Sequence, residues 1–266
     1  MITIPIKVKD RLVAGIKRFQ NVISRAKDKD INESDTVTII TDILSDVFGY
    51  DKYTEITSEF LIKHTFCDLA IKMENDVRLL IEVKAIGIDL KEAQIKQAVD
   101  YGSNAGIDWV ILTNGNTWKV YKIVFSKPID TELVYSFDFI TLNTKKPADI
   151  ELLYYLTREA MVKSSKISLE DYHVQKQLVN RFTLGQLLLT EPIIDMFRRQ
   201  LKRMSPEIKA SNEEIRQILT EEVIKREVLD GDKALDAKKK VDKAMKAQAK
   251  LIAPKVKPDI AIPSEE

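Results

Sequence analysis

The heptapeptide Leu79-Leu80-Ile81-Glu82-Val83-Lys84-Ala85, residues 79–85, places a carboxylate and an ammonium inside an otherwise apolar run. Aliphatic and β-branched residues favour a strand, and residues two apart on a strand project from the same face. Glu82 and Lys84 are therefore expected side by side near the centre of a sheet. Charges in such a place are costly unless they pair with each other or hold a metal ion.

The same spacing, an acid two residues before a lysine, recurs at Asp89/Lys91, Glu207/Lys209 and Asp236/Lys238. A chain in which 31% of the residues are charged gives such pairs by chance. Only the pair at 82 and 84 lies within an apolar strand. Its simplest alternative reading is an ion pair on a solvated sheet face.

Around this stretch the hydrophobic spacing predicts a helix, three strands, a second helix and two more strands. The expected elements are, in chain order, 32–49, 56–62, 64–71, 77–85, 91–101, 109–113 and 118–123. Turn residues at 74–76 favour an antiparallel meander of the first three strands, and Asn114-Gly115 is a strong hairpin signal. The predicted fold class is α/β, with a mixed sheet flanked by helices.

The strand signal disappears after Lys145-Lys146-Pro147, and a helical C-terminal domain is expected from there on. Its predicted helices are 150–162, 172–189, 193–204 and 213–228, followed by a lysine- and alanine-rich helix. The expected organisation is an N-terminal helix over 1–30, an α/β domain over 31–146, a helical domain over 147–230, and a lysine-rich helix with a loose tail over 231–266.

Composition limits the class of protein and the kind of site. With 42 Lys and Arg against 41 Asp and Glu, the chain is not a polycation, and 44% hydrophobic residues suffice for a core. One cysteine and two histidines exclude a disulfide framework and a Cys/His zinc cluster, so a metal must bind carboxylates. Neither a spanning apolar run nor a signal peptide is evident, and we expect a cytoplasmic protein without a membrane partner.

A second carboxylate fits the same place as Glu82. Asp68 lies in the preceding strand, and a short meander brings it beside Glu82. Two carboxylates and a main-chain carbonyl, most simply that of Val83, form an oxygen site suited to Mg²⁺ or Mn²⁺. Lys84 is then placed to orient a water molecule or to stabilise a developing oxyanion. The expected reaction is hydrolysis of a phosphodiester.

Asp68 and, fourteen residues on, Glu82-Val83-Lys84 resemble the core of the PD-(D/E)xK nucleases. Gln97 and Tyr101 match the QxxxY motif of the RecB-like and type I restriction R-subunit branches of that superfamily. The stretch Leu112-Thr113-Asn114-Gly115 and the aromatic strand after it further resemble the N-terminal nuclease domain of type I restriction enzyme R subunits and its stand-alone relatives. The resemblance covers residues 30 to 145.

The resemblance implies a restriction-endonuclease-like sheet and a Mg²⁺-dependent endonuclease that acts on DNA, in restriction, defence or DNA processing. Carried over by position, Asp68 and Glu82 are metal ligands and Lys84 is the catalytic lysine. A helix-borne acid of the superfamily maps to Glu33. The pair Gln97 and Tyr101, four apart on one helix face, is expected to reach the same phosphate or base edge.

The sequence departs from the family pattern in two respects: the residue before Asp68, and the ATP-driven motor that accompanies this nuclease in type I R subunits. Cys67 stands where the family usually has a proline before Asp68. The sequence also contains no GxxxxGK[ST] phosphate loop, so cleavage is ATP-independent or a motor or specificity subunit acts in trans. The competing hypothesis is a catalytically silent module that binds nucleic acid or docks a partner. The oligomeric state is not readable from the sequence.

Several candidate residues have simpler structural explanations. Glu33 also suits the positive end of its helix, and Glu59 reads as a surface carboxylate rather than an outer acid. His64 lacks a neighbour in sequence that would orient it, and we leave it out of the site. Four cations on one predicted helix fit either a solvated face or a grip on a DNA backbone. These cations are Arg198, Arg199, Lys202 and Arg203.

Overall fold

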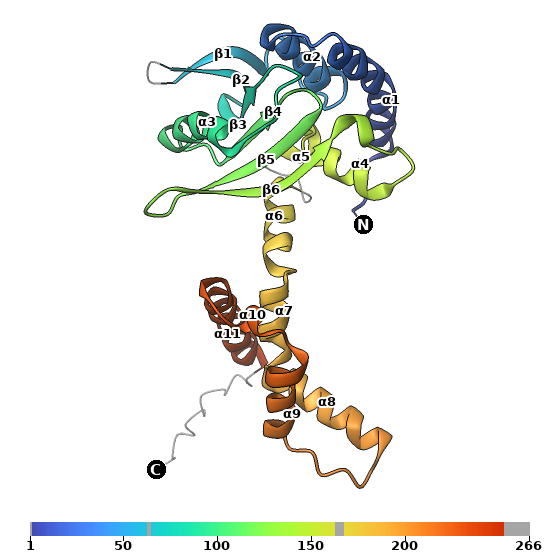
Figure 1. Ribbon diagram of the computed structural model, residues 1–266, viewed down its shortest axis with the longest axis vertical. Helices are drawn as coiled ribbons and strands as arrows, with labels where there is room; N and C mark the ends of the chain where they lie inside the picture. Colours follow the sequence, from blue (N-terminus) through green and yellow to red (C-terminus); the bar gives the residue numbers. More distant parts are fainter. Residues whose placement is uncertain (1, 63–64, 163–167, 253–266) are drawn as a thin grey trace, which may run out of the picture. The chain divides into compact units, whose positions relative to one another are not determined.

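Six strands lie in chain order across one sheet (Figure 1). They are β1 (Ile56–Ile62), β2 (Thr65–Met73), β3 (Asp76–Val83), β4 (Trp109–Thr113), β5 (Thr117–Val124) and β6 (Asp130–Asp138). The computed structural model describes residues 2–62, 65–162 and 168–252. Neighbouring strands are antiparallel except β3 and β4, which are parallel because helix α3 (Glu92–Ala105) crosses over between them. The predicted mixed α/β fold is thus confirmed.

A tight turn and a register shift together set the pairing of β2 with β3. Glu74 and Asn75 have φ angles of 54° and 68°, the left-handed conformation that two-residue hairpin turns require. Pairing starts with Met73 opposite Asp76, shifts by one residue between Ile71 and Lys72, and ends with Leu69 opposite Ile81. The predicted meander β1-β2-β3 is correct, and the next residues beyond its last registered pair are Asp68 and Glu82.

Helices cover both faces of this sheet (Figure 1). On one face lie α1 (Ile6–Asp28), α2 (Glu33–Asp46), α4 (Pro147–Tyr154) and α5 (Arg158–Met161), whose apolar side chains form one core with strand residues such as Ile81 and Ile111. The other face is covered by α3, which packs on Leu80, Val110 and Leu112. β3 and β4 are therefore buried on both sides.

Four expectations are corrected. The predicted helix 213–228 is α9 (Asn212–Ile218), a π-helical turn (Leu219–Val223) and a separate short helix, α10 (Arg226–Leu229). β6 was not predicted, because its polar start reads as a loop; it pairs with β5 along its whole length. The predicted helix 150–162 is two helices, α4 and α5, since the side chain of Thr157 caps a new start. The predicted helix 172–189 likewise breaks into α6 (Leu169–Leu178) and α7 (Arg181–Leu188), where Asn180 caps the second.

Contacts between residues divide the chain into two units, Met1–Val174 and Gln175–Glu266, whereas the sequence suggested a boundary after residue 146. The second unit holds α7, α8 (Glu191–Met204), α9 (Asn212–Ile218), a π-helical turn (Leu219–Val223), α10 (Arg226–Leu229) and α11 (Asp232–Ile252). A small core around Ile194 and Ile215 joins α8 to α9. The lysine-rich α11 packs against α7, and the side chains that it buries among residues 232–248 are small and apolar, namely Ala234, Ala237 and Val241.

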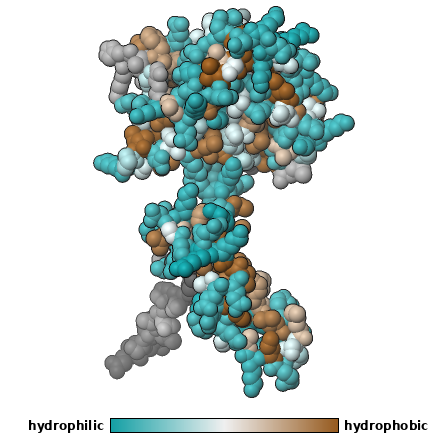
Figure 2. Space-filling model, viewed as in Figure 1, coloured by the Kyte–Doolittle hydropathy of each residue, from teal (hydrophilic) through white to brown (hydrophobic). Residues whose placement is uncertain are grey.

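Hydrophilic side chains dominate the face of the first unit seen in Figure 2, and its apolar side chains lie in separate patches. Within the described residues, no helix combines the length and apolar character needed to cross a bilayer.

Candidate active site

Asp68 on β2 and Glu82 on β3 meet where the meander joins the parallel strand pair. They follow the registered pair Leu69–Ile81, and residues directly opposite on antiparallel strands have Cβ atoms about 5 Å apart. The backbone N–H of Val83 donates to Oδ2 of Asp68 at 2.7 Å. This bond fixes the Asp68 carboxylate against the end of β3. Two of the predicted site residues are thus brought together.

Lys84 follows at the end of β3 and lies between the carboxylates of Glu82 and Glu33. Its Nζ donates to Oε1 of Glu82 at 2.8 Å and lies 3.6 Å from Oε2 of Glu33. Its backbone N–H donates to the carbonyl of Thr113 at 2.8 Å, which extends the β3–β4 pairing by one residue. Glu33 is in the first turn of α2, whose start is fixed by the Asn32 side chain accepting from the backbone of Asp35. All four predicted charged residues therefore converge.

Burial shifts the pKa values of Asp68, Glu82 and Lys84. Burial raises the pKa of Asp68, and the Val83 N–H and the Lys84 ammonium offset this only in part. Burial also raises the pKa of Glu82, and repulsion from Asp68 and Glu33 adds to it, against the hydrogen bond from Lys84. Burial alone would lower the pKa of Lys84, but its bond to Glu82 and the surrounding carboxylates leave that pKa raised. Lys84 is an ammonium at neutral pH.

One carboxylate oxygen of Glu82 accepts no hydrogen bond from the described residues. Glu82 is 5% exposed, and its Oε2 is buried without a hydrogen-bond partner in the described structure. A buried carboxylate oxygen without a partner is costly, and a cation would satisfy it. Across residues 2–62, 65–162 and 168–252, no three His, Cys, Asp or Glu side chains gather as a metal-ligand group. Two carboxylates and a carbonyl nevertheless suit the oxygen chemistry of Mg²⁺ or Mn²⁺.

The loop after Lys84 is held by residues that sequence reasoning did not assign to the site. The side-chain amide of Asn114 donates to the carbonyls of Ile86 and Ile88, at 3.2 and 2.9 Å, while its oxygen accepts from the backbone of the β4–β5 turn. Lys119 Nζ donates to the carbonyl of Leu90 at 2.8 Å. The sequence marks Asn114 only as a turn residue. Its partners lie 26 and 28 positions away, and only the fold reveals them.

The other predicted residues stand outside this cluster. Gln97 belongs to α3, but its side chain is not part of the described structure. Tyr101 is 7% exposed and lies in the apolar cluster between α3 and the sheet. Glu59 is an exposed residue of β1. His64 falls outside the described residues.

Cys67, beside Asp68, is fully buried. Its Sγ lies 3.4 Å from the carbonyl of Ile81 and 3.5 Å from that of Leu69. Burial, assisted by the nearby charges of Glu82 and Asp68, raises the pKa of this thiol to about 12. The residue that replaces the expected proline is a packing residue.

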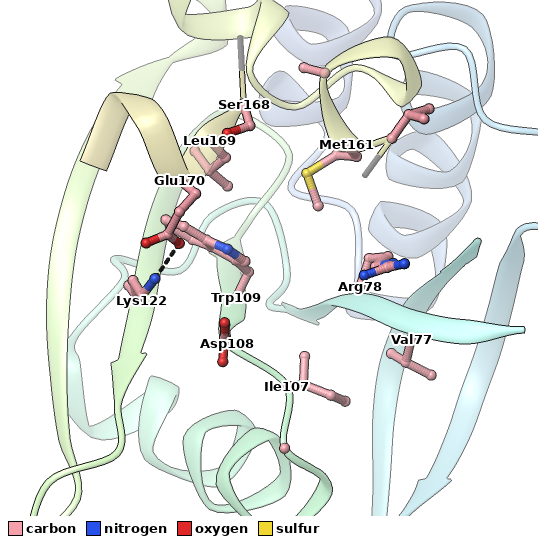
Figure 3. A pocket seen from close by; sticks show the side chains of 13 residues that line it. Val77, Arg78, Ile107, Asp108, Trp109, Lys122, Met161, Ser168, Leu169 and Glu170 are labelled. Atoms are coloured by element: carbon pink, nitrogen blue, oxygen red, sulfur yellow. Dashed lines mark hydrogen bonds and ion pairs between the residues drawn. The ribbon is translucent and has the colours of Figure 1, made fainter. Parts of the chain in front are cut away.

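A cavity of about 450 Å³ lies at the opposite end of β3 and β4 (Figure 3). Val77 and Arg78 from the start of β3 line it, together with Trp109 from the start of β4. Lys122 lies over the Trp109 ring at 5.1 Å and pairs with Glu170. The cavity contains none of the predicted site residues, so we place the candidate active site at the other end, where parallel strands commonly bind ligands.

Residues 38–134 match the family described as the type I restriction enzyme R protein N terminus. The predicted resemblance to that nuclease domain is therefore confirmed over this range, which contains Asp68, Glu82 and Lys84 but not Glu33. No curated protein and no solved structure matches the chain.

Proposed function

We propose, from the match of residues 38–134 and the cluster at the end of β3, that this protein is a metal-dependent deoxyribonuclease. It would hydrolyse phosphodiester bonds of DNA in restriction, defence or DNA processing. The observation that carries the proposal is the buried, unpartnered Oε2 of Glu82, two residues before an ammonium and opposite a second carboxylate. Such an arrangement costs stability and is retained where it serves a site.

Asp68, Glu82 and the carbonyl of Val83 would hold the cation. Mg²⁺ or Mn²⁺, when bound there, would neutralise charge on the scissile phosphate and lower the pKa of a water molecule. The Val83 N–H holds one Asp68 oxygen, which presets the direction of that carboxylate.

Lys84 would act as a charge rather than as a base. Its raised pKa keeps the proton on Nζ, between the carboxylates of Glu82 and Glu33. An ammonium held in this way can donate to the attacking water and offset negative charge as the phosphoryl group becomes pentavalent. Glu33 would limit the movement of Lys84 rather than contact the phosphate. Gln97 keeps its predicted role in substrate contact, whereas Tyr101 is buried in the apolar cluster between α3 and the sheet and would support that helix instead.

Partners follow from the same proposal. These 266 residues contain no GxxxxGK[ST] loop, so any coupling of cleavage to ATP would come from a motor outside them.

The test is cleavage of supercoiled, linear and single-stranded DNA by the full chain with Mg²⁺ or Mn²⁺. We expect Asp68→Asn, Glu82→Gln and Lys84→Met each to lower the rate at least about 100-fold. These substitutions preserve side-chain size, and tryptophan fluorescence checks the fold. Glu59→Gln, which removes an exposed carboxylate from β1, is the matched control and should cleave normally. Equal rates in wild type and Lys84→Met would expose a contaminant.

A catalytically silent module is the second candidate, and one observation favours it. The Lys84 ammonium already occupies Oε1 of Glu82, as in a purely structural ion pair. Absence of cleavage on every DNA form with both metals, with DNA binding intact, would establish this alternative.

A further inference from the structure

Helix α8 in the second unit, outside the matched residues 38–134, carries a group of exposed cations that we call the α8 basic face. It consists of Arg199, Lys202 and Arg203. These residues are three and four apart, so their side chains lie on one side of the helix. All three are exposed, and none has a carboxylate within 4.0 Å in the part of the chain that the structure describes.

Other arginines of this unit are neutralised internally. The pairs are Arg181 with Glu227, Arg198 with Asp195, Arg216 with Glu191 and Glu213, and Arg226 with Asp230. Acids are thus available in the unit, yet none is placed beside Arg199 or Arg203. The positive charges of Arg199 and Arg203 are therefore not neutralised by carboxylates within the described residues, and an external anion can bind them.

The opposite side of α8 holds the helix in place. Ile194 is fully buried, and Phe197 and Leu201 pack against the same small core as Ile215. The basic face is therefore presented by a helix anchored along its length. Lys202 and Arg203 also lie in the last turn, where cations stabilise the negative end of a helix, but Arg199 lies a turn earlier, beyond the reach of that effect.

We propose that the α8 basic face binds the phosphodiester backbone of duplex DNA and so holds the substrate independently of its sequence. Guanidinium groups match phosphate geometry, and cations without internal counter-charges gain most from counterion release on a polyanion. The inference rests on the proposed function only for the identity of the polyanion.

The experiment measures affinity of the full chain for a fluorescent DNA duplex in EDTA, across a range of NaCl concentrations. The logarithm of the association constant K decreases linearly with the logarithm of the salt concentration, and the magnitude of this slope decreases by about 0.9 for each phosphate that the protein no longer neutralises. Arg199→Gln/Arg203→Gln should reduce it by about 1.8, and addition of Lys202→Gln by about 2.7. At 0.1 M salt these changes correspond to about 60-fold and about 500-fold weaker binding.

Arg181→Gln/Arg226→Gln is the matched control, because it removes two guanidinium groups from the same unit at sites that are already paired. It should keep the wild-type slope. Urea unfolding curves verify that every variant folds.

Equal slopes for the basic-face and control variants would overturn the inference and leave the nuclease proposal standing. Wild type that binds phosphatidylserine vesicles but not DNA would also overturn it, in favour of a membrane. Conversely, a loss confined to the basic-face variants, with no cleavage by wild type, would support this inference while the nuclease proposal fails.

Discussion

Replacement of Lys84 by methionine should destabilise the first unit in a pH-dependent way. The substitution keeps the stem of the side chain and removes the ammonium that donates to Glu82. Glu82 then keeps no hydrogen bond on either oxygen, because Oε2 already lacks a partner within the described residues. Removal of one member of a buried ion pair typically costs about 3–5 kcal/mol. Since the Lys84 side chain is 21% exposed and water can replace part of its effect, we expect about 3 kcal/mol at pH 8.

Protonation of Glu82 limits this loss. Protonation of a carboxylate costs about 1.4 kcal/mol for each pH unit above its ordinary pKa of 4.5. Neutralising Glu82 in the variant therefore costs about 5 kcal/mol at pH 8, but only about 1.4 kcal/mol at pH 5.5. A carboxyl whose folded pKa is raised contributes stability that is present below its unfolded pKa and lost as pH rises through its folded pKa. Loss of Lys84 raises the folded pKa of Glu82 further, so the gap between variant and wild type should open as pH rises through the folded pKa of Glu82 in the wild type, which lies above 4.5.

Urea denaturation followed by tryptophan fluorescence measures this effect. Both tryptophans, Trp109 and Trp118, are buried in the first unit, so the signal reports that unit alone. The double variant Lys84→Met/Glu82→Gln removes the charge together with its partner and should recover most of the loss. An equal loss at pH 5.5 and pH 8, or a double variant no more stable than Lys84→Met, would refute the reasoning.

The remaining predictions concern the surroundings of the site. Asn114→Asp removes both bonds to the loop carbonyls and buries a charge, and urea denaturation should show a loss of about 2–4 kcal/mol. Gly102→Ala places a Cβ 2.5 Å from Cδ1 of Ile123, and the same assay should show about 1–3 kcal/mol less stability. Gln97→Ala should weaken DNA binding more than metal binding in calorimetric titrations, and the reverse order would remove Gln97 from substrate contact. Deletion of residues 233–266 should leave the first unit folded, which a large drop in its urea midpoint would contradict.

Local patterns were sufficient where short-range geometry decides the structure. The polar cap Asn32 and the spacing after it predict α2, and the turn at Glu74 and Asn75 predicts that β2 pairs with β3. The turn alone would place Asp68 opposite Ile81. The register shift between Ile71 and Lys72, which the sequence does not predict, moves the pairing by one residue and brings Asp68 opposite Glu82. Glu33, predicted as an additional acid, lies near Lys84.

Features that depend on distant contacts were not predictable in the same way. Nothing near Asn114 in sequence shows that its amide will hold the loop after Lys84. β6 begins with polar residues at the edge of the sheet, where burial imposes no regular pattern. The helix breaks at Thr157 and Asn180 had local signals, since both are good capping residues, but apolar spacing continued through them.

The single thiol of the chain gives the candidate site its own reporter of local opening. Cys67 is fully buried beneath α3 and burial raises its pKa to about 12, so a thiol reagent cannot reach a thiolate while this part of the sheet stays closed. Labelling must await local opening, by departure of α3 or by separation of the strands, and its rate measures how often that opening occurs. Because Asp68 is the next residue, a ligand that bridges the two strands would slow the labelling, and occupancy could be read on the unmodified sequence.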